Sequence, residues 1–267
     1  MFDKLSIEIN EKKVKIVYGN YKNNFFHIKK FYTLSNSYYE SNRKKMINSL
    51  LKDEKISSKR VSFIFNNPNL ICKSIQTPIK RERNIDSFMA YEWEKHIPKN
   101  KEYVTRYKIL KKSPEGIKIL WVSCPRKIID EYRELCLNFN LKPHVLNVAA
   151  DSIFKIFKEM NSHETIAFMR LEEDHLYLNI INNKYDLISK SINMQKSKSI
   201  VDMIGRLFKY FEQEYKSPVS KIAFVGDAFN NLKELNLPIL NEIHGIEISN
   251  KLNILDNIEI LGSIISR

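Results

Sequence analysis

Cysteine is scarce in this chain of 267 residues, which contains only 3. Cys72, Cys124 and Cys136 form no CxxC pair, so the sequence predicts neither a disulfide framework nor a zinc site and suits a reducing compartment. No apolar run approaches the ~20 residues that a membrane-spanning helix needs. The N-terminus also lacks the basic flank and apolar core of a signal peptide. We therefore expect a cytoplasmic protein without a resident metal.

The chain is strongly basic, with a formal net charge of +13. Such a charge can attract nucleic acid or anionic lipid headgroups. The basic residues are scattered, however, with acids interleaved, as in residues 79–83. No stripe of Lys and Arg alternates with stacking aromatics, so we predict no nucleic-acid partner. We interpret the charge mainly as overall composition, with attraction to a membrane surface as a smaller contribution.

The sequence repeats one order of elements near its two ends. Apolar patterning in the first part predicts three strands, a helix and a buried strand, over residues 5–9, 14–18, 25–32, 39–51 and 61–65. The last part predicts the same order over residues 165–169, 176–181, 185–192, 200–215 and 221–225, followed by a helix near 254–265. The order strand-strand-strand-helix-strand therefore occurs twice.

An additional module lies between these two parts and begins near Leu70. It predicts a strand, a helix and a strand pair, over residues 70–76, 85–95, 103–110 and 117–123. A helix that starts near Pro125, a strand over 144–148 and a helix over 149–160 complete the middle of the chain. No low-complexity linker separates the modules, so we expect them to pack as one body.

Several stretches match the motifs of one protein family in order and spacing. Residues 5–15 fit an opening strand pair that usually reads Asp-Ile-Gly-x-x-x-Val-Lys, and residues 88–98 fit a helix that ends in Glu-x-x-x-x-Ile-Pro. Leu141-Lys142-Pro143, residues 189–192 and Leu261-Gly262 fit later motifs. Over nearly its whole length, the chain resembles the PilM family of type IV pilus assembly proteins.

This resemblance implies an α/β fold of the actin-like class, in which a ribonuclease H-like β-β-β-α-β unit is duplicated around an inserted α+β subdomain. The implied division is a first subdomain over residues 1–69 and 146–160, an inserted subdomain over 70–145 and a second actin-like subdomain over 161–267. The family's small fourth subdomain is largely absent, because almost no chain separates Ile192 from the helix that begins near Lys196.

The residues at the implied nucleotide site depart from the pattern of the family. Actin-like sites hold phosphate with glycine-rich turns and place an acidic residue beside each turn. In the first turn, the usual Asp is Glu8 and the usual Gly is Asn10, which can still adopt the left-handed conformation. In the second turn, Arg170 replaces the Asp and Glu172 replaces the Gly.

The second turn also carries three consecutive acids, residues 172–174, where phosphate would lie. One carboxylate about 4 Å from one phosphate charge costs roughly 4 kcal/mol at an effective dielectric constant of 20, or about a thousandfold in affinity. The adenosine-side turn keeps Gly226, but its second Gly is Asp227. We therefore expect weak or absent ATP binding, no hydrolysis and no required cofactor.

Two features of the second turn allow more than one interpretation. The acidic triplet could hold a metal ion, although such clusters are more often solvated hairpin turns. Arg170 could contact phosphate, or it could be a strand-end residue that pairs with a neighbouring Glu. We favour the hairpin turn and the pairing with Glu.

As a function, the resemblance implies a cytoplasmic scaffold of the inner-membrane platform, peripheral to the membrane, that binds the cytoplasmic N-terminal tail of PilN. Further implied partners are other platform proteins and the assembly motor ATPase. In the family the tail enters a groove between the first and inserted subdomains, and Trp93, Ile97 and Pro98 are our predicted contacts. Trp93 could instead pack its helix onto its own module. The alternative function is an ATP-binding actin-like protein whose nucleotide state regulates pilus assembly or filament formation.

Overall fold

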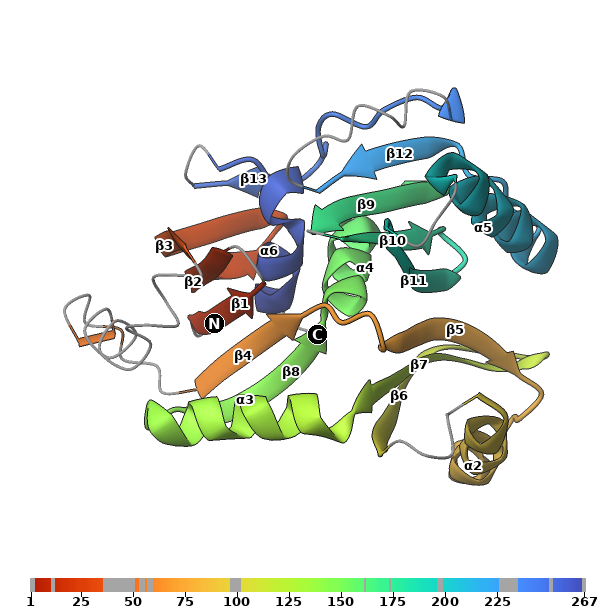
Figure 1. Ribbon diagram of the computed structural model, residues 1–267, viewed down its shortest axis with the longest axis horizontal. Helices are drawn as coiled ribbons and strands as arrows, with labels where there is room; N and C mark the ends of the chain where they lie inside the picture. Colours follow the sequence, from red (N-terminus) through yellow and green to blue (C-terminus); the bar gives the residue numbers. More distant parts are fainter. Residues whose placement is uncertain are drawn as a thin grey trace.

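A computed structural model describes residues 3–10, 13–35, 51–52, 56, 60–96, 102–160, 162–172, 174–195, 199–225, 235–249 and 252–265. The strands of these residues form two mixed sheets, and helices cover and separate them (Figure 1).

The first sheet has the strand order β13-β3-β2-β1-β4-β8. Its strands are β1 (Lys4–Ile9), β2 (Lys13–Lys22), β3 (Phe25–Ser35), β4 (Arg60–Phe65), β8 (Lys142–Val148) and β13 (Glu247–Ile248). The first three strands form an antiparallel meander, as their alternating apolar residues predict. β4 runs parallel to β1, and β8 runs parallel to β4 at the edge of the sheet.

The second sheet has the order β12-β9-β10-β11-β5-β7-β6. Its strands are β5 (Ile71–Thr77), β6 (Tyr103–Ser113), β7 (Gly116–Pro125), β9 (Ile166–Glu172), β10 (His175–Ile181), β11 (Leu187–Asn193) and β12 (Lys221–Phe224). β9, β10, β11 and β12 repeat the pairing of β1, β2, β3 and β4 in part, with β9 to β11 antiparallel and β12 parallel to β9. The strands of the inserted module extend this sheet, because β5 pairs with β11.

The helices are α2 (Ile85–His96), α3 (Arg126–Asn138), α4 (Ala149–Glu159), α5 (Ile200–Tyr215) and α6 (Ile258–Ile264), with short turns η1 (Glu82–Asn84) and η3 (Leu255–Asn257). In Figure 1, α4 and α6 lie in the middle of the molecule, and their side chains share one core with residues of both sheets. The two helices approach closely at Gly262, where a Cβ atom would lie 2.0 Å from the carbonyl oxygen of Ser152.

The predicted elements are confirmed wherever they fall on described residues, apart from small differences in their bounds. Most of the helix predicted over 39–51 lies outside the described residues. The predicted division grouped residues 247–248 and 258–264 with the second subdomain and residues 142–145 with the inserted subdomain. In the structure, β13 pairs with β3, α6 packs against β1 and β2, and β8 pairs with β4, so all three elements contact the first sheet.

Candidate functional site

Arg170 and Glu8 meet where β9 and β1 end, between the two sheets. Arg170 Nη1 lies 2.6 Å from Glu8 Oε1 and 3.1 Å from Glu172 Oε1. The structure therefore brings together three of the residues predicted for the degenerate phosphate turns. It also shows the pairing with a neighbouring Glu that was one interpretation of Arg170, and adds Glu8 as a second acidic partner.

Two further charged residues at this place were not predicted. Glu259 on α6 puts its Oε2 atom 2.7 Å from Arg170 Nη1, and Lys15 Nζ on β2 donates a 2.6 Å hydrogen bond to the carbonyl oxygen of Asp256. Glu259 is the one charged residue of α6, a helix whose residues are all buried. A lone charge inside an apolar run was the available signal for it. We call Glu8, Lys15, Arg170, Glu172 and Glu259 the Arg170 cluster.

The Arg170 cluster is almost completely removed from water. Glu8 is 2% exposed, Glu259 1% and Arg170 6%. Burial disfavours the charged form of each group, and a neighbouring opposite charge favours it. The ionisation of each group therefore depends on the charges of the others. Arg170 Nη1 is already shared among three carboxylates, so a phosphate would have to compete with them for this atom.

The pKa values in the cluster diverge because each carboxyl has a different balance of burial and positive neighbours. Burial would raise the pKa of Glu8, but Arg170 and then Lys15 outweigh it, and the pKa is lowered. Burial raises the pKa of Glu259 to about 8 despite the attraction of Arg170. Burial also raises the pKa of Glu172, and it lowers the pKa of the Lys15 ammonium.

Asn10 closes the turn that follows β1. Its side-chain oxygen accepts a 2.7 Å hydrogen bond from the Lys13 backbone, and its own backbone N–H donates to the Lys13 carbonyl at 3.1 Å. Asn10 is not among the described residues with positive φ, so it does not use the left-handed conformation that the sequence allowed. Gly226 and Asp227 lie outside the described residues.

The acidic triplet over 172–174 is only partly described, because residue 173 is not. Glu172 turns towards Arg170, and the backbone carbonyl of Asp174 accepts a 2.7 Å hydrogen bond from Met194. In the part of the chain that the structure describes, no group of three His, Cys, Asp or Glu side chains is arranged to hold a metal ion.

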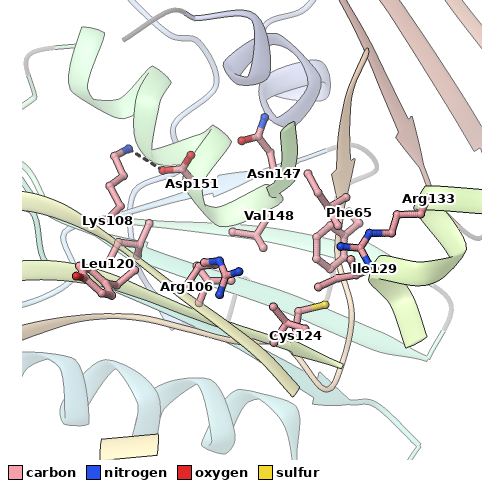
Figure 2. Close-up of a pocket in the computed structure, with 14 residues that line it drawn as sticks. Phe65, Arg106, Lys108, Leu120, Cys124, Ile129, Arg133, Asn147, Val148 and Asp151 are labelled. Atoms are coloured by element: carbon pink, nitrogen blue, oxygen red, sulfur yellow. Dashed lines mark hydrogen bonds and ion pairs between the residues drawn. The ribbon is translucent and has the colours of Figure 1, made fainter. Parts of the chain in front are cut away.

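A cavity of about 380 Å³ forms the second candidate site (Figure 2). We call it the β6–β8 cavity, because it lies between the strands of the inserted module and the edge of the first sheet. Its lining comes from β4, β6, β7, α3, β8 and α4: Phe65, Val104, Arg106, Tyr107, Lys108, Leu120, Val122, Cys124, Ile129, Arg133, Leu146, Asn147, Val148 and Asp151.

The β6–β8 cavity has an apolar interior and charged side chains around it. Lys108 Nζ forms a 3.0 Å ion pair with Asp151, drawn as a dashed line in Figure 2. Arg106 is exposed and donates to the carbonyl oxygen of Thr105 at 2.8 Å. β6 and β8 are the outermost strands of their sheets among the described residues. Two strand edges therefore lie beside one apolar cavity.

The structure does not bring Trp93 to this cavity. Trp93 is 37% exposed on α2. α2 packs its Ile85 and Met89 against Ile119 and Trp121 of β7. The cavity contacts the opposite face of β7, because successive side chains of a strand point to opposite faces. Ile97 and Pro98 lie outside the described residues.

A sequence signal for this cavity existed in β7, which is apolar on both faces. Ile117, Ile119 and Trp121 face α2, whereas Leu120 and Val122 line the cavity. Two apolar faces indicate that the strand is covered on both sides, and here the second cover is the first sheet with α3 and α4. No helix in the described part of the chain is long and apolar enough to cross a membrane.

Comparison with known proteins identifies the fold. No protein-family model matches the chain, and no curated protein matches its sequence. The structure of a PilM–PilN type IV pilus biogenesis complex matches with a TM-score of 0.76 and 13% identity, over 99% of both chains.

Two other solved structures are also similar. One is the cytoplasmic domain of EpsL, an inner membrane component of the type II secretion system of Vibrio cholerae, with a TM-score of 0.58 and 10% identity over 99% of this chain and 96% of that one. The other is a protein from Bacteroides thetaiotaomicron with an actin-like ATPase fold and unknown function. It matches with a TM-score of 0.54 and 14% identity, over 97% of this chain and 95% of that one. The chain therefore has an actin-like α/β fold of the PilM kind, as its sequence predicted.

Proposed function

We propose that the chain is a scaffold of a type IV pilus assembly platform and binds the cytoplasmic N-terminal tail of a PilN-like protein in the β6–β8 cavity. The observation that carries this proposal is an apolar cavity bordered by the edges of two sheets. The likeness to the PilM–PilN complex supports the choice of partner.

The geometry of the cavity favours an extended peptide. An edge strand offers unpaired backbone N–H and C=O groups, to which a peptide can add as a further strand. Its alternate side chains would then point into the apolar interior formed by Leu120, Val122 and Val148. In this mode, main-chain hydrogen bonds provide affinity and the apolar cavity provides specificity.

The same scaffold is proposed to have little or no affinity for nucleotide and no enzymatic activity. Arg170 forms ion pairs with Glu8 and Glu259 at the place where the phosphate turns converge. A triphosphate would have to displace these ion pairs and would then lie near three carboxylates. The competing proposal, an ATP-regulated actin-like protein, requires the phosphate to overcome this arrangement.

We place the protein in the cytoplasm, at the face of the cytoplasmic membrane, where the PilN-like partner would tether it. The net charge of +13 would add attraction to anionic lipid. Other platform proteins and the assembly motor ATPase are further proposed partners.

Titration of the protein with a labelled synthetic peptide of the cognate PilN-like N-terminus tests the main proposal. We expect saturable binding that Val104→Lys weakens at least tenfold, because Val104 lines the cavity from β6 and a charged side chain would enter an apolar site. Val145→Lys is the matched control, since Val145 on β8 is 41% exposed and does not line the cavity.

Circular dichroism and thermal melting of both variants separate loss of binding from loss of folding. An absence of binding to the wild-type protein at high micromolar peptide would contradict the scaffold proposal. Equal weakening by both substitutions would show that the peptide binds elsewhere.

A further inference from the structure

The Arg170 cluster joins parts of the fold that are far apart in the sequence. Glu8 belongs to the first sheet, Arg170 belongs to the second sheet, and Glu259 belongs to the helix between them. Arg170 Nη1 contacts all three carboxylates of the cluster at 2.6–3.1 Å. One guanidinium nitrogen therefore links both sheets and α6.

The charges of the cluster do not balance if every group is ionised. Three carboxylates face two positive groups, Arg170 and Lys15, and all five side chains are largely buried. An uncompensated negative charge in such a site is strongly unfavourable, and a buried carboxyl group usually relieves it by keeping its proton.

One oxygen atom shows where such a proton would lie. Glu8 Oε2 is buried and has no hydrogen-bond partner. Arg170 Nη1 brings the Glu259 carboxyl group close to that of Glu8, because it contacts Glu8 Oε1 at 2.6 Å and Glu259 Oε2 at 2.7 Å. Buried polar atoms without a partner are rare, and each one calls for a physical cause. One proton held between the two carboxyl groups gives Glu8 Oε2 a partner and makes the cluster neutral.

The groups around Glu259 are consistent with this arrangement. Its Oε1 atom accepts a 3.4 Å hydrogen bond from Asn66, which follows β4. From the other elements it faces Glu8 and Lys15 of the first sheet and Arg170 and Glu172 of β9. On α4, which also packs against α6, Asp151 and Lys155 pair with each other at 3.3 Å.

We infer that Glu8 and Glu259 share one proton, which makes the Arg170 cluster a neutral, proton-dependent clamp between the two sheets. The clamp occupies the place where the phosphate turns of an actin-like protein converge, so that side chains hold the cleft closed instead of a ligand. The inference concerns the folded chain alone and does not depend on the partner proposed for the β6–β8 cavity.

The clamp makes stability fall as the pH rises. The pKa of Glu259 in the folded protein, about 8, lies above that of an exposed Glu, so the folded state binds one more proton than the unfolded state between these values. The stabilising contribution is therefore complete below the ordinary carboxyl pKa and is lost as the pH rises through about 8. This one group lowers the folding equilibrium constant up to about tenfold per pH unit in that interval.

Urea unfolding between about pH 6 and about pH 9 tests this in three proteins: wild type, Glu259→Gln and Glu212→Gln. The amide introduced by Glu259→Gln would be a neutral group that can donate to Glu8, as the protonated carboxyl does. We expect the free energy of unfolding to fall less in Glu259→Gln than in the wild type as the pH rises. Glu212 is exposed on α5, so the same chemical change there should leave the wild-type slope intact.

Infrared spectroscopy gives a second readout that folding defects in a variant do not affect. We expect the wild type near neutral pH to show the C=O stretch of a protonated, buried carboxyl group, which disappears as the pH rises through about 8. Absence of this band in the wild type would overturn the inference. The inference would also be overturned if the free energy of unfolding depended on pH equally in the wild type and in a folded Glu259→Gln variant.

Discussion

Arg170 determines the character of the implied phosphate site. A smaller or acidic residue at the end of β9 would leave the space between the strands open, whereas the guanidinium reaches Glu8 and Glu259 at 2.6 and 2.7 Å. Glu259, Glu8 and Glu172 hold the pKa of Arg170 above its ordinary value although burial alone would lower it. The arginine is thus charged at every accessible pH, and proton exchange in the cluster is left to the carboxyl groups and to Lys15.

Arg170→Met is expected to destabilise the protein by about 3–5 kcal/mol near neutral pH, because it leaves three buried carboxyl groups with Lys15 as their nearby positive charge. Urea unfolding measures this loss. The loss should shrink towards acidic pH, where the carboxyl groups become neutral. Arg206→Met on the exposed face of α5 is the control and should change stability by no more than about 0.5 kcal/mol. A loss below about 1 kcal/mol for Arg170→Met would contradict the central role of this residue.

Among the elements, every strand except the two-residue β13 could be predicted, and the position of α6 could not. Alternating apolar residues identify β1, β2 and β3 directly, because one face of each strand is buried. α6 is buried on every side, so its sequence indicates burial but not which sheet covers it. Sequence order assigned it to the second part of the chain, whereas the fold returns it to the first sheet.

Gly262 is the point at which α6 and α4 need a residue without a side chain. Gly262→Ala would place a Cβ atom 2.0 Å from the carbonyl oxygen of Ser152, and this backbone atom cannot move without shifting α4. We expect a loss of about 1–3 kcal/mol, seen as a lower melting temperature.

Gly205→Ala in α5 is the matched control for this substitution. No atom lies within 4 Å of a Cβ built there, so the better helix propensity of Ala should raise stability by about 0.5–1 kcal/mol. Equal melting temperatures for the two Ala variants would contradict the close approach of α4 and α6.

At the scale of the whole molecule, the candidate site could be predicted only in part. Glu8, Arg170 and Glu172 follow from the resemblance to the PilM family, which implies that they stand at the two phosphate turns. Glu259 and Lys15 did not follow, because their nearness to Arg170 depends on how α6 and β2 pack in three dimensions. The resemblance implied a groove between the first and inserted subdomains. The residues that line the β6–β8 cavity were not predicted, since they come from six separate elements.

The two halves of an actin-like fold can be held together by a ligand between them or by their own side chains. In this chain, ion pairs of 2.6 and 2.7 Å already connect β1, β9 and α6. We therefore expect calorimetry with ATP and Mg²⁺ to detect no saturable binding at micromolar concentrations. Because the chain carries a net charge of +13, weak nonspecific attraction of any polyanion is expected at low salt, and it should vanish at about 0.15 M salt, where the screening length is about 8 Å. Inorganic tripolyphosphate is the control for that attraction. Micromolar ATP binding that persists at this salt concentration and exceeds that of tripolyphosphate would show that the Arg170 cluster opens for nucleotide, and it would favour the ATP-regulated alternative.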